Sequence, residues 1–128
     1  MANEINISFS VSCTKLGATV SGSSSLSQTL SGSNFQSVTQ DIGTVEALTI
    51  AAEIAAGGWV RVKNLTDDVG GTVLVPTLTV STANPATSTT TIAVLLPGEA
   101  CPCKPGTNTL FGTSSSGNCA AQVLVIEP

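Results

Sequence analysis

The residues with the clearest capacity for binding chemistry lie on one short stretch, Gly57 to Leu65. It contains the single tryptophan of the chain, Trp59, and two of its four basic residues, Arg61 and Lys63. Valines alternate with these three residues, and a period of two places alternate side chains on opposite faces of a β-strand. The stretch therefore predicts a central strand with one face in the core. The other face carries an indole and two cations that can contact a partner.

A purely structural interpretation of the same stretch stays open. Trp59 can pack at the rim of a sheet against the aliphatic stems of Arg61 and Lys63, with no partner involved. Pro76 belongs with this surface, because a proline inside the apolar run from Thr72 to Val80 lacks an N–H and is expected at a sheet edge or bulge. Together these four residues are the candidate partner-binding residues.

Catalytic chemistry is not expected. The chain has no histidine, the commonest general base and proton shuttle. Asp67 and Asp68 are adjacent in a Gly-rich turn, so they are expected in solvent, with a calcium or sugar site as the lesser alternative. The remaining carboxylates, such as Glu46, Glu53 and Glu99, are scattered. We expect no catalytic residues, no cofactor and no enzyme.

The four cysteines permit several arrangements. Their even number allows two disulfides or a four-sulfur metal site. Free thiols are favoured, because cytosolic synthesis keeps thiols reduced and free cysteine is usually buried. At least one disulfide is the second alternative. Metal is the least favoured, since Cys101 and Cys103 are separated by one residue where zinc knuckles use about two to four. The cysteines concerned are Cys13, Cys101, Cys103 and Cys119.

Charge and hydropathy exclude two classes of partner. The net charge is −4, and the few cations are too sparse to displace counterions from nucleic acid. No apolar run approaches the ~20 residues that a membrane-spanning helix needs. The N-terminal residues Met1 to Glu4 lack the basic flank and apolar segment of a secretory signal. The expected location is the cytosol, or a particle released from it by lysis.

The length of 128 residues favours one domain over 1–128. Apolar residues alternate with polar ones from Ile5 to Cys13 and predict a half-buried first strand. Residues 17–34 form a Ser/Gly-rich strand-loop region. A flexible linker is one interpretation of this region, and an exposed strand over Leu26 to Leu30, which we favour, is the other.

Further short strands separated by Gly, Pro, Asn and Asp follow at 35–41, 72–80, 89–96, 101–103, 107–111 and 120–126. The segment 44–56 is ambiguous between strand and helix. Two hairpins are expected, one joining 44–56 to the Trp59 strand and one joining the last two strands. The final strand should be central, because both its faces are apolar. The predicted fold is all-β, an antiparallel β-sandwich or jelly roll.

Four short motifs carry a resemblance to a known class of protein. They are Glu46-Ala47-Leu48, the run Gly58 to Leu65, the run Leu95 to Ala100 and the run Val123 to Glu127. Together they resemble small β-sandwich virion structural proteins of tailed bacteriophages. The resemblance covers residues 44–128 and leaves the Ser-rich first third unmatched. The chain departs from the pattern in its Gly-rich turn at Thr66 to Gly71 and in Cys-Pro-Cys after the Gly-Glu pair.

The resemblance implies a structural role on a virion assembled in the host cytoplasm. The role that the resemblance favours is a capsid decoration (cement) or minor head protein, and the second choice is a tail or fibre-base component. The implied partners are the major capsid protein or other virion proteins, and further copies of the chain in a trimer or other ring. The resemblance also favours a strand over 44–54. A carbohydrate-binding β-sandwich module is the rival, although one Trp and no Tyr make a poor sugar platform.

Overall fold

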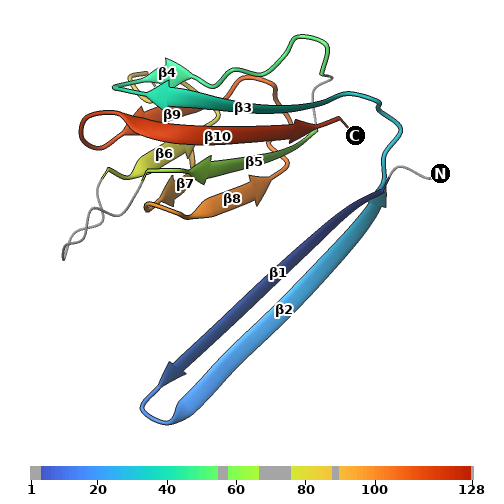
Figure 1. Cartoon of the computed structure of the whole chain (residues 1–128), viewed down its shortest axis with the longest axis vertical. Helices are drawn as coiled ribbons and strands as arrows, with labels where there is room; N and C mark the ends of the chain where they lie inside the picture. Colours follow the sequence, from blue (N-terminus) through green and yellow to red (C-terminus); the bar gives the residue numbers. More distant parts are fainter. Residues whose placement is uncertain (1–3, 55–57, 67–75, 88–89, 128) are drawn as a thin grey trace. The chain divides into compact units, whose positions relative to one another are not determined.

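The structure, a computed structural model, describes residues 4–54, 58–66, 76–87 and 90–127. The chain divides into two compact units, Met1–Ser31 and Gly32–Pro128. The described residues contain ten strands and no helix, and every strand pairing is antiparallel (Figure 1). The predicted all-β, antiparallel class is therefore confirmed.

The first unit is one long β-hairpin made of β1 (Glu4–Lys15) and β2 (Ala18–Thr29), paired without interruption along all twelve residues of each strand. Leu16 and Gly17 connect the strands with φ of 53° and 79°, as the two central positions of a type I′ turn require. The strand favoured over 26–30 is confirmed and is longer than expected, so the linker alternative is wrong. The expected half-burial of the first strand is also wrong beyond Ile7, since Phe9 is 61% exposed.

The second unit contains two four-stranded sheets, with strand orders β3-β10-β5-β8 and β4-β9-β6-β7. Their strands are β3 (Phe35–Ile42), β4 (Glu46–Ala47), β5 (Trp59–Asn64), β6 (Leu78–Ser81), β7 (Thr91–Leu95), β8 (Ala100–Cys103), β9 (Phe111–Ser114) and β10 (Cys119–Ile126).

One hydrophobic core joins these two sheets. Its buried side chains are Ile42, Leu48, Ile54, Val60, Val62, Leu78, Val80, Leu95, Leu110, Cys119, Ala121, Val123 and Val125. They are almost all aliphatic, as expected from a chain with four aromatic residues. β5 and β10 both lie inside their sheet, so the two strands predicted to be central are confirmed.

The ambiguous segment 44–56 is neither a helix nor a full strand in its described part. Only Glu46–Ala47 pairs as β4, with β9. Around and beyond β4, side-chain amides make the hydrogen bonds that the backbone of a neighbouring strand would otherwise make. Gln40 accepts from the Thr49 N–H at 2.9 Å and donates to the Ala47 carbonyl at 3.0 Å. Gln36 satisfies the Thr49 carbonyl and the Ala51 N–H in the same way. These glutamines of β3 hold the segment extended without a strand ladder.

Both predicted hairpins are wrong, because the chain passes between the sheets where a hairpin was expected. β4 and β5 lie in different sheets, and so do β9 and β10. A type II turn forms at Pro97-Gly98, because Gly98 has φ 82° and the Glu99 N–H donates to the Leu96 carbonyl at 3.0 Å. Of the turn expected at Thr66 to Gly71, residues 67–71 lie outside the described residues.

Candidate partner-binding face

β5 separates a buried face from a surface face. Val60 and Val62 are 3% and 0% exposed and belong to the core. Trp59, Arg61 and Lys63 alternate with them and are half-buried on the opposite side of the sheet. The predicted two-faced central strand is confirmed. We call the surface that bears these three residues the outer face of the β3-β10-β5-β8 sheet.

Strand register assembles the outer face from all four strands. Residues directly opposite each other across an antiparallel pair share a face. The rows that include β5 are therefore Phe35-Ile126-Trp59, Ser37-Leu124-Arg61-Pro102 and Thr39-Gln122-Lys63-Ala100. Phe35 is 78% exposed. The row at the Trp59 end is thus aromatic and aliphatic, while the next two rows become polar and cationic.

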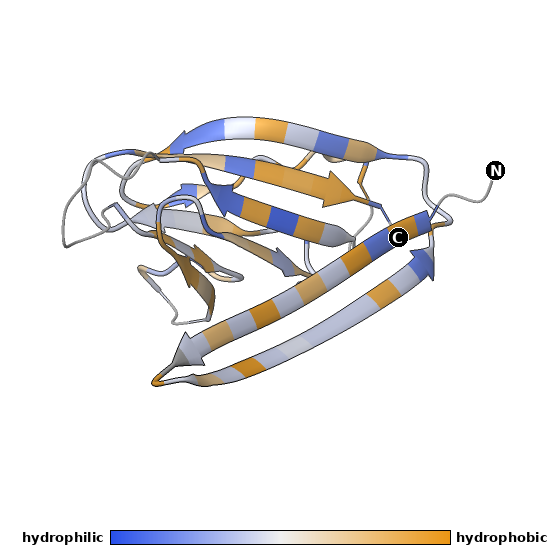
Figure 2. Ribbon diagram, turned by 60° about the horizontal axis from the view of Figure 1, so that its bottom comes forward, coloured by the Kyte–Doolittle hydropathy of each residue, from blue (hydrophilic) through white to orange (hydrophobic). Residues whose placement is uncertain are grey.

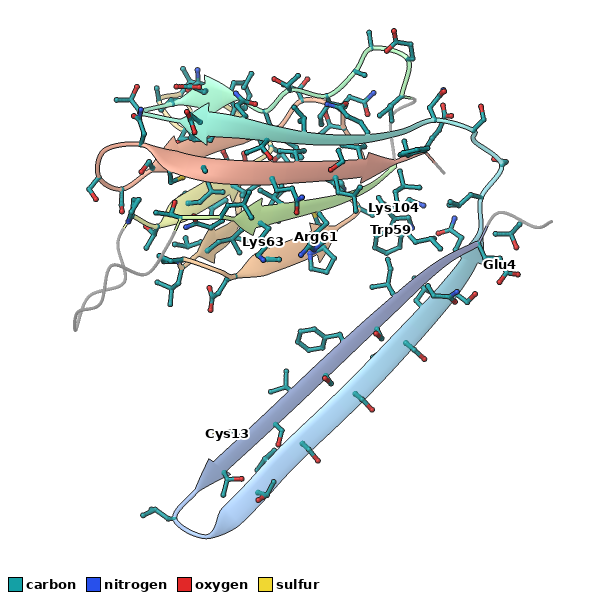
Figure 3. All side chains as sticks on the ribbon, viewed as in Figure 1. Glu4, Cys13, Trp59, Arg61, Lys63 and Lys104 are labelled. Carbon is teal, nitrogen blue, oxygen red and sulfur yellow. The ribbon has the colours of Figure 1, made fainter. Side chains whose placement is uncertain are left out.

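Two contacts hold cations on this face. Lys104 Nζ lies over the Trp59 ring, 5.9 Å from its centroid, which is cation–π geometry (Figure 3). Arg61 Nη1 donates to Gln122 Oε1 at 3.2 Å, and this bond fixes the guanidinium beside β10. Cation–π contact with Trp59 is therefore made by Lys104, a residue that the sequence did not assign to the site.

Nothing in the sequence indicated that Lys104 lies beside Trp59, because its position depends on strand pairing and not on the spacing of residues along the chain. Cys103 is opposite Val60, so the residue after Cys103 comes level with Trp59. The sequence indicated a short strand over 101–103 but not that it pairs with β5.

The outer face differs in charge from the rest of the chain. The chain has eight Asp and Glu against four Lys and Arg, yet three of those four cations are Arg61, Lys63 and Lys104. Asp41, exposed at the far end of β3, is the acidic residue that strand register places on this face. A partner that fits the face therefore presents acidic groups beside an apolar or aromatic contact.

Pro76 does not belong to this face, which corrects the sequence expectation. It precedes β6, and β6 lies between β9 and β7, so it is not an edge strand. The Pro76 carbonyl accepts a hydrogen bond of 3.0 Å from Asn64 Nδ2. Asn64 is completely buried on the core face of β5. The Pro76 carbonyl therefore bonds to a residue on the opposite face of β5 from Arg61.

The cysteines are all unpaired in the structure, but only Cys119 is buried. Cys101 and Cys103 are opposite Val62 and Val60, so both lie on the core side of β8 and are half-buried. Burial, and then the neighbouring Cys101, raises the pKa of Cys103 to about 11. Burial also raises the pKa of Cys119. Cys13 is exposed on the hairpin, which differs from the expected burial.

In the part of the chain that the structure describes, no group of three or more His, Cys, Asp or Glu side chains is placed to hold a metal ion. Nor do the described residues include a helix long and apolar enough to span a bilayer.

Comparison with protein-family models, with curated proteins and with solved structures gave no match for this chain.

Proposed function

We propose that this chain is a non-enzymatic structural protein of a tailed-bacteriophage virion that attaches to the shell, as a capsid decoration or minor head protein, through its outer face. One observation carries the proposal beyond the sequence resemblance. An acidic chain concentrates its tryptophan, an exposed phenylalanine and three of its four cations on one side of a single sheet. That arrangement is suited to adhesion, and it presents no pair of groups for acid–base catalysis.

The rows of the outer face suggest how it would adhere. Trp59 and Phe35 provide large rigid contact area, which is the composition of an interface centre. Arg61 and Lys63, one row and two rows away, supply a cationic rim that orients the protein on an acidic surface. Each contact is small, but a shell repeats its subunits many times. Weak contacts of an oligomer then add through multiplicity.

The two sheets that share one core are compatible with the β-sandwich that the resemblance implies. The partner is then the major capsid protein or a neighbouring virion protein. A tail or fibre-base position uses the same face and differs in location alone.

A carbohydrate-binding module is the second candidate function. It is favoured by Phe35, which with Ile126 lies in one row with Trp59 and gives the sheet end two rings on which a sugar can stack. Sugar binding would quench the fluorescence of Trp59, the single tryptophan. A protein that binds a virion shell would leave that fluorescence unchanged across a panel of glycans.

The location of the chain tests the proposal directly. Particles purified from its source are labelled with a gold-conjugated antibody against the chain, and label is counted on heads and tails. Label spread over heads is the expected result. Label confined to tails would move the proposal to a tail or fibre-base component, and particles without label would overturn the virion role.

A further inference from the structure

The hairpin has one apolar and one polar face along its whole length. On β1 the apolar face carries Ile5, Ile7, Phe9, Val11 and Cys13. Their partners on β2 are, in order, Gln28, Leu26, Ser24, Gly22 and Val20. The opposite face is built from serine, threonine and asparagine between Glu4 and Lys15. Figure 2 shows the resulting alternation of hydrophobic and polar segments along β1.

The apolar face is largely open to solvent. Phe9, Val11 and Leu26 are 61%, 50% and 49% exposed, and Val20 is 73% exposed. An isolated two-stranded hairpin is at best marginally stable in water. A ribbon of twelve residues per strand, about 40 Å long at roughly 3.4 Å per residue, exposes an apolar stripe of a kind that soluble proteins usually cover.

The shape of the apolar face indicates what covers it. Phe9 on β1 lies opposite Ser24, and Val11 lies opposite Gly22. Large side chains therefore form a ridge along β1, and small ones leave a depression in the middle of β2. The depression is bounded by Leu26 on one side and Val20 on the other. The face thus carries a ridge on β1 and a depression on β2, and the two lie at the same level along the hairpin.

We propose that the hairpin is a self-association arm whose apolar face packs on the same face of a second copy of this chain. A two-fold axis parallel to the strands places β1 of each copy over β2 of the other at the same level. Phe9 of one copy then lies over Ser24 of its partner, and Val11 over Gly22. A two-fold axis across the strands would stack ridge on ridge, so the first arrangement is the one that packs.

Charge also favours a second copy over a different partner. Among the ten residues of the apolar face none is charged, and Glu4 and Lys15 are the only charged residues between 4 and 29. An acidic or basic partner therefore finds no complement on this face. Another copy supplies an uncharged face whose ridge fits the depression.

The available area agrees with a modest, specific contact. If large side chains carry roughly 150–200 Å² each, the exposed parts of Phe9, Val11, Val20 and Leu26 offer about 400 Å² per copy. Two copies bury about 800 Å² from these four residues alone, before Ile5, Ile7 and Cys13 are added. The total approaches the roughly 1,200 Å² at which specific interfaces begin. The contact is therefore expected to depend on protein concentration.

This self-association goes beyond the proposed virion role and does not rest on it. The hairpin and the outer face are different surfaces with different partners. Association of the purified chain tests the first, and binding to particles tests the second, so either can fail alone.

The test measures the mass of the purified full chain by light scattering over a concentration series, for matched variants on neighbouring residues. Wild type is expected to reach the mass of two copies. Phe9→Asp places a charge on the apolar face and is expected to give the mass of one copy. Ser10→Asp makes a similar change on the polar face and is expected to associate like wild type.

A second pair separates specific packing from general stickiness. Ser24→Leu adds apolar surface but fills the depression, so it is expected to weaken association at least ten-fold. Ser25→Leu adds the same surface to the opposite face and serves as its control. Stronger association of Ser24→Leu, a wild type that stays monomeric, or a mass of three copies would each overturn the two-fold packing.

A third measurement uses the exposed thiol of Cys13 as a probe. Both Cys13 residues lie at the same level of the paired arms, so a short bismaleimide is expected to yield a dimer band on a denaturing gel. Cys13→Ser should abolish that band, and Phe9→Asp should reduce it. A band that persists in Cys13→Ser would show that the arms are not the contact.

Discussion

Replacing Asn64 by alanine is expected to cause a large loss of stability, because this buried side chain joins three parts of the second unit. Its Nδ2 donates to the carbonyls of Pro76 at 3.0 Å and Leu95 at 3.2 Å. Its Oδ1 accepts from the Thr66 N–H at 3.0 Å. The side chain therefore ties the end of β5 to the entry of β6 and to the end of β7.

The magnitude follows from the groups that lose a partner. A buried polar group left without a hydrogen bond costs roughly 1–3 kcal/mol. The half-buried Pro76 and Thr66 are taken at about 1 kcal/mol each, because water can reach them in part. Leu95 is 5% exposed, and its carbonyl is taken at about 2 kcal/mol. The expected loss for Asn64→Ala is then about 4 kcal/mol, a large share of the stability of a typical domain.

Urea unfolding followed by the fluorescence of Trp59 measures this loss, because the single tryptophan lies on the same strand as Asn64. With a slope of roughly 2 kcal/mol per molar urea, the midpoint should fall by about 2 M. Asn6→Ala makes the same change at an exposed position on the hairpin and should leave the midpoint unchanged. A decrease of less than about 1 kcal/mol for Asn64→Ala would refute the role given to the three hydrogen bonds.

Three substitutions and one reactivity measurement test the strand geometry and the thiols. Gly58→Ala would place its Cβ 2.6 Å from the backbone carbonyl oxygen of Ile126, so a destabilisation of about 2 kcal/mol or more is expected in the same urea assay. Gly98→Ala meets no atom within 4 Å but must adopt φ 82°, so a loss of about 1 kcal/mol is expected, and no loss would contradict the turn geometry. Because the native pKa of Cys103 is raised from 9.0 to about 11, its folded form holds the proton more tightly, and stability should fall as the pH rises from about 9 to 11, but less so in Cys103→Ser. At neutral pH, Cys13 should react with Ellman's reagent well before Cys103, and equal rates would argue against the burial of Cys103.

The sequence predicted the elements better than their partners. The period of two along β1 and β5 and the two apolar faces of β10 are local signals, and each strand formed where its pattern indicated. The pairing of those strands is a long-range property. The pairing of β4 with β9 and the pairing of β5 with β8 have no signature in the local spacing of residues. Both predicted hairpins were therefore wrong.

The residues of the outer face were predicted in part for the same reason. Trp59, Arg61 and Lys63 share a strand, so alternation alone brought them to one face. Lys104 and Phe35 reach that face through β8, β10 and β3. Pro76 was misplaced because an apolar run from 72 to 80 predicted a strand around it, whereas β6 begins at Leu78.

The outer side of β10 is less buried than its apolar sequence predicted. Leu124 and Ile126 indicated a strand buried on both sides, yet they are half-buried and line the outer face beside Arg61 and Trp59. An apolar run does not distinguish a strand buried on both sides from one whose outer side is only half-buried.

The most direct test of the central claim is co-sedimentation of the purified chain with virion particles from its source, comparing Lys63→Glu with the double variant Ser116→Glu/Asn118→Glu. Both proteins change the net charge by two units, but the first changes a residue in the middle of the outer face, whereas Ser116 and Asn118 lie exposed in the loop between β9 and β10, beyond the rows that carry Trp59, Arg61 and Lys63. We predict that wild type and the loop variant sediment with particles, and that Lys63→Glu binds roughly ten-fold more weakly, equivalent to about 1.4 kcal/mol. Equal sedimentation of the two variants, or a wild type that stays in the supernatant, would contradict attachment through this face.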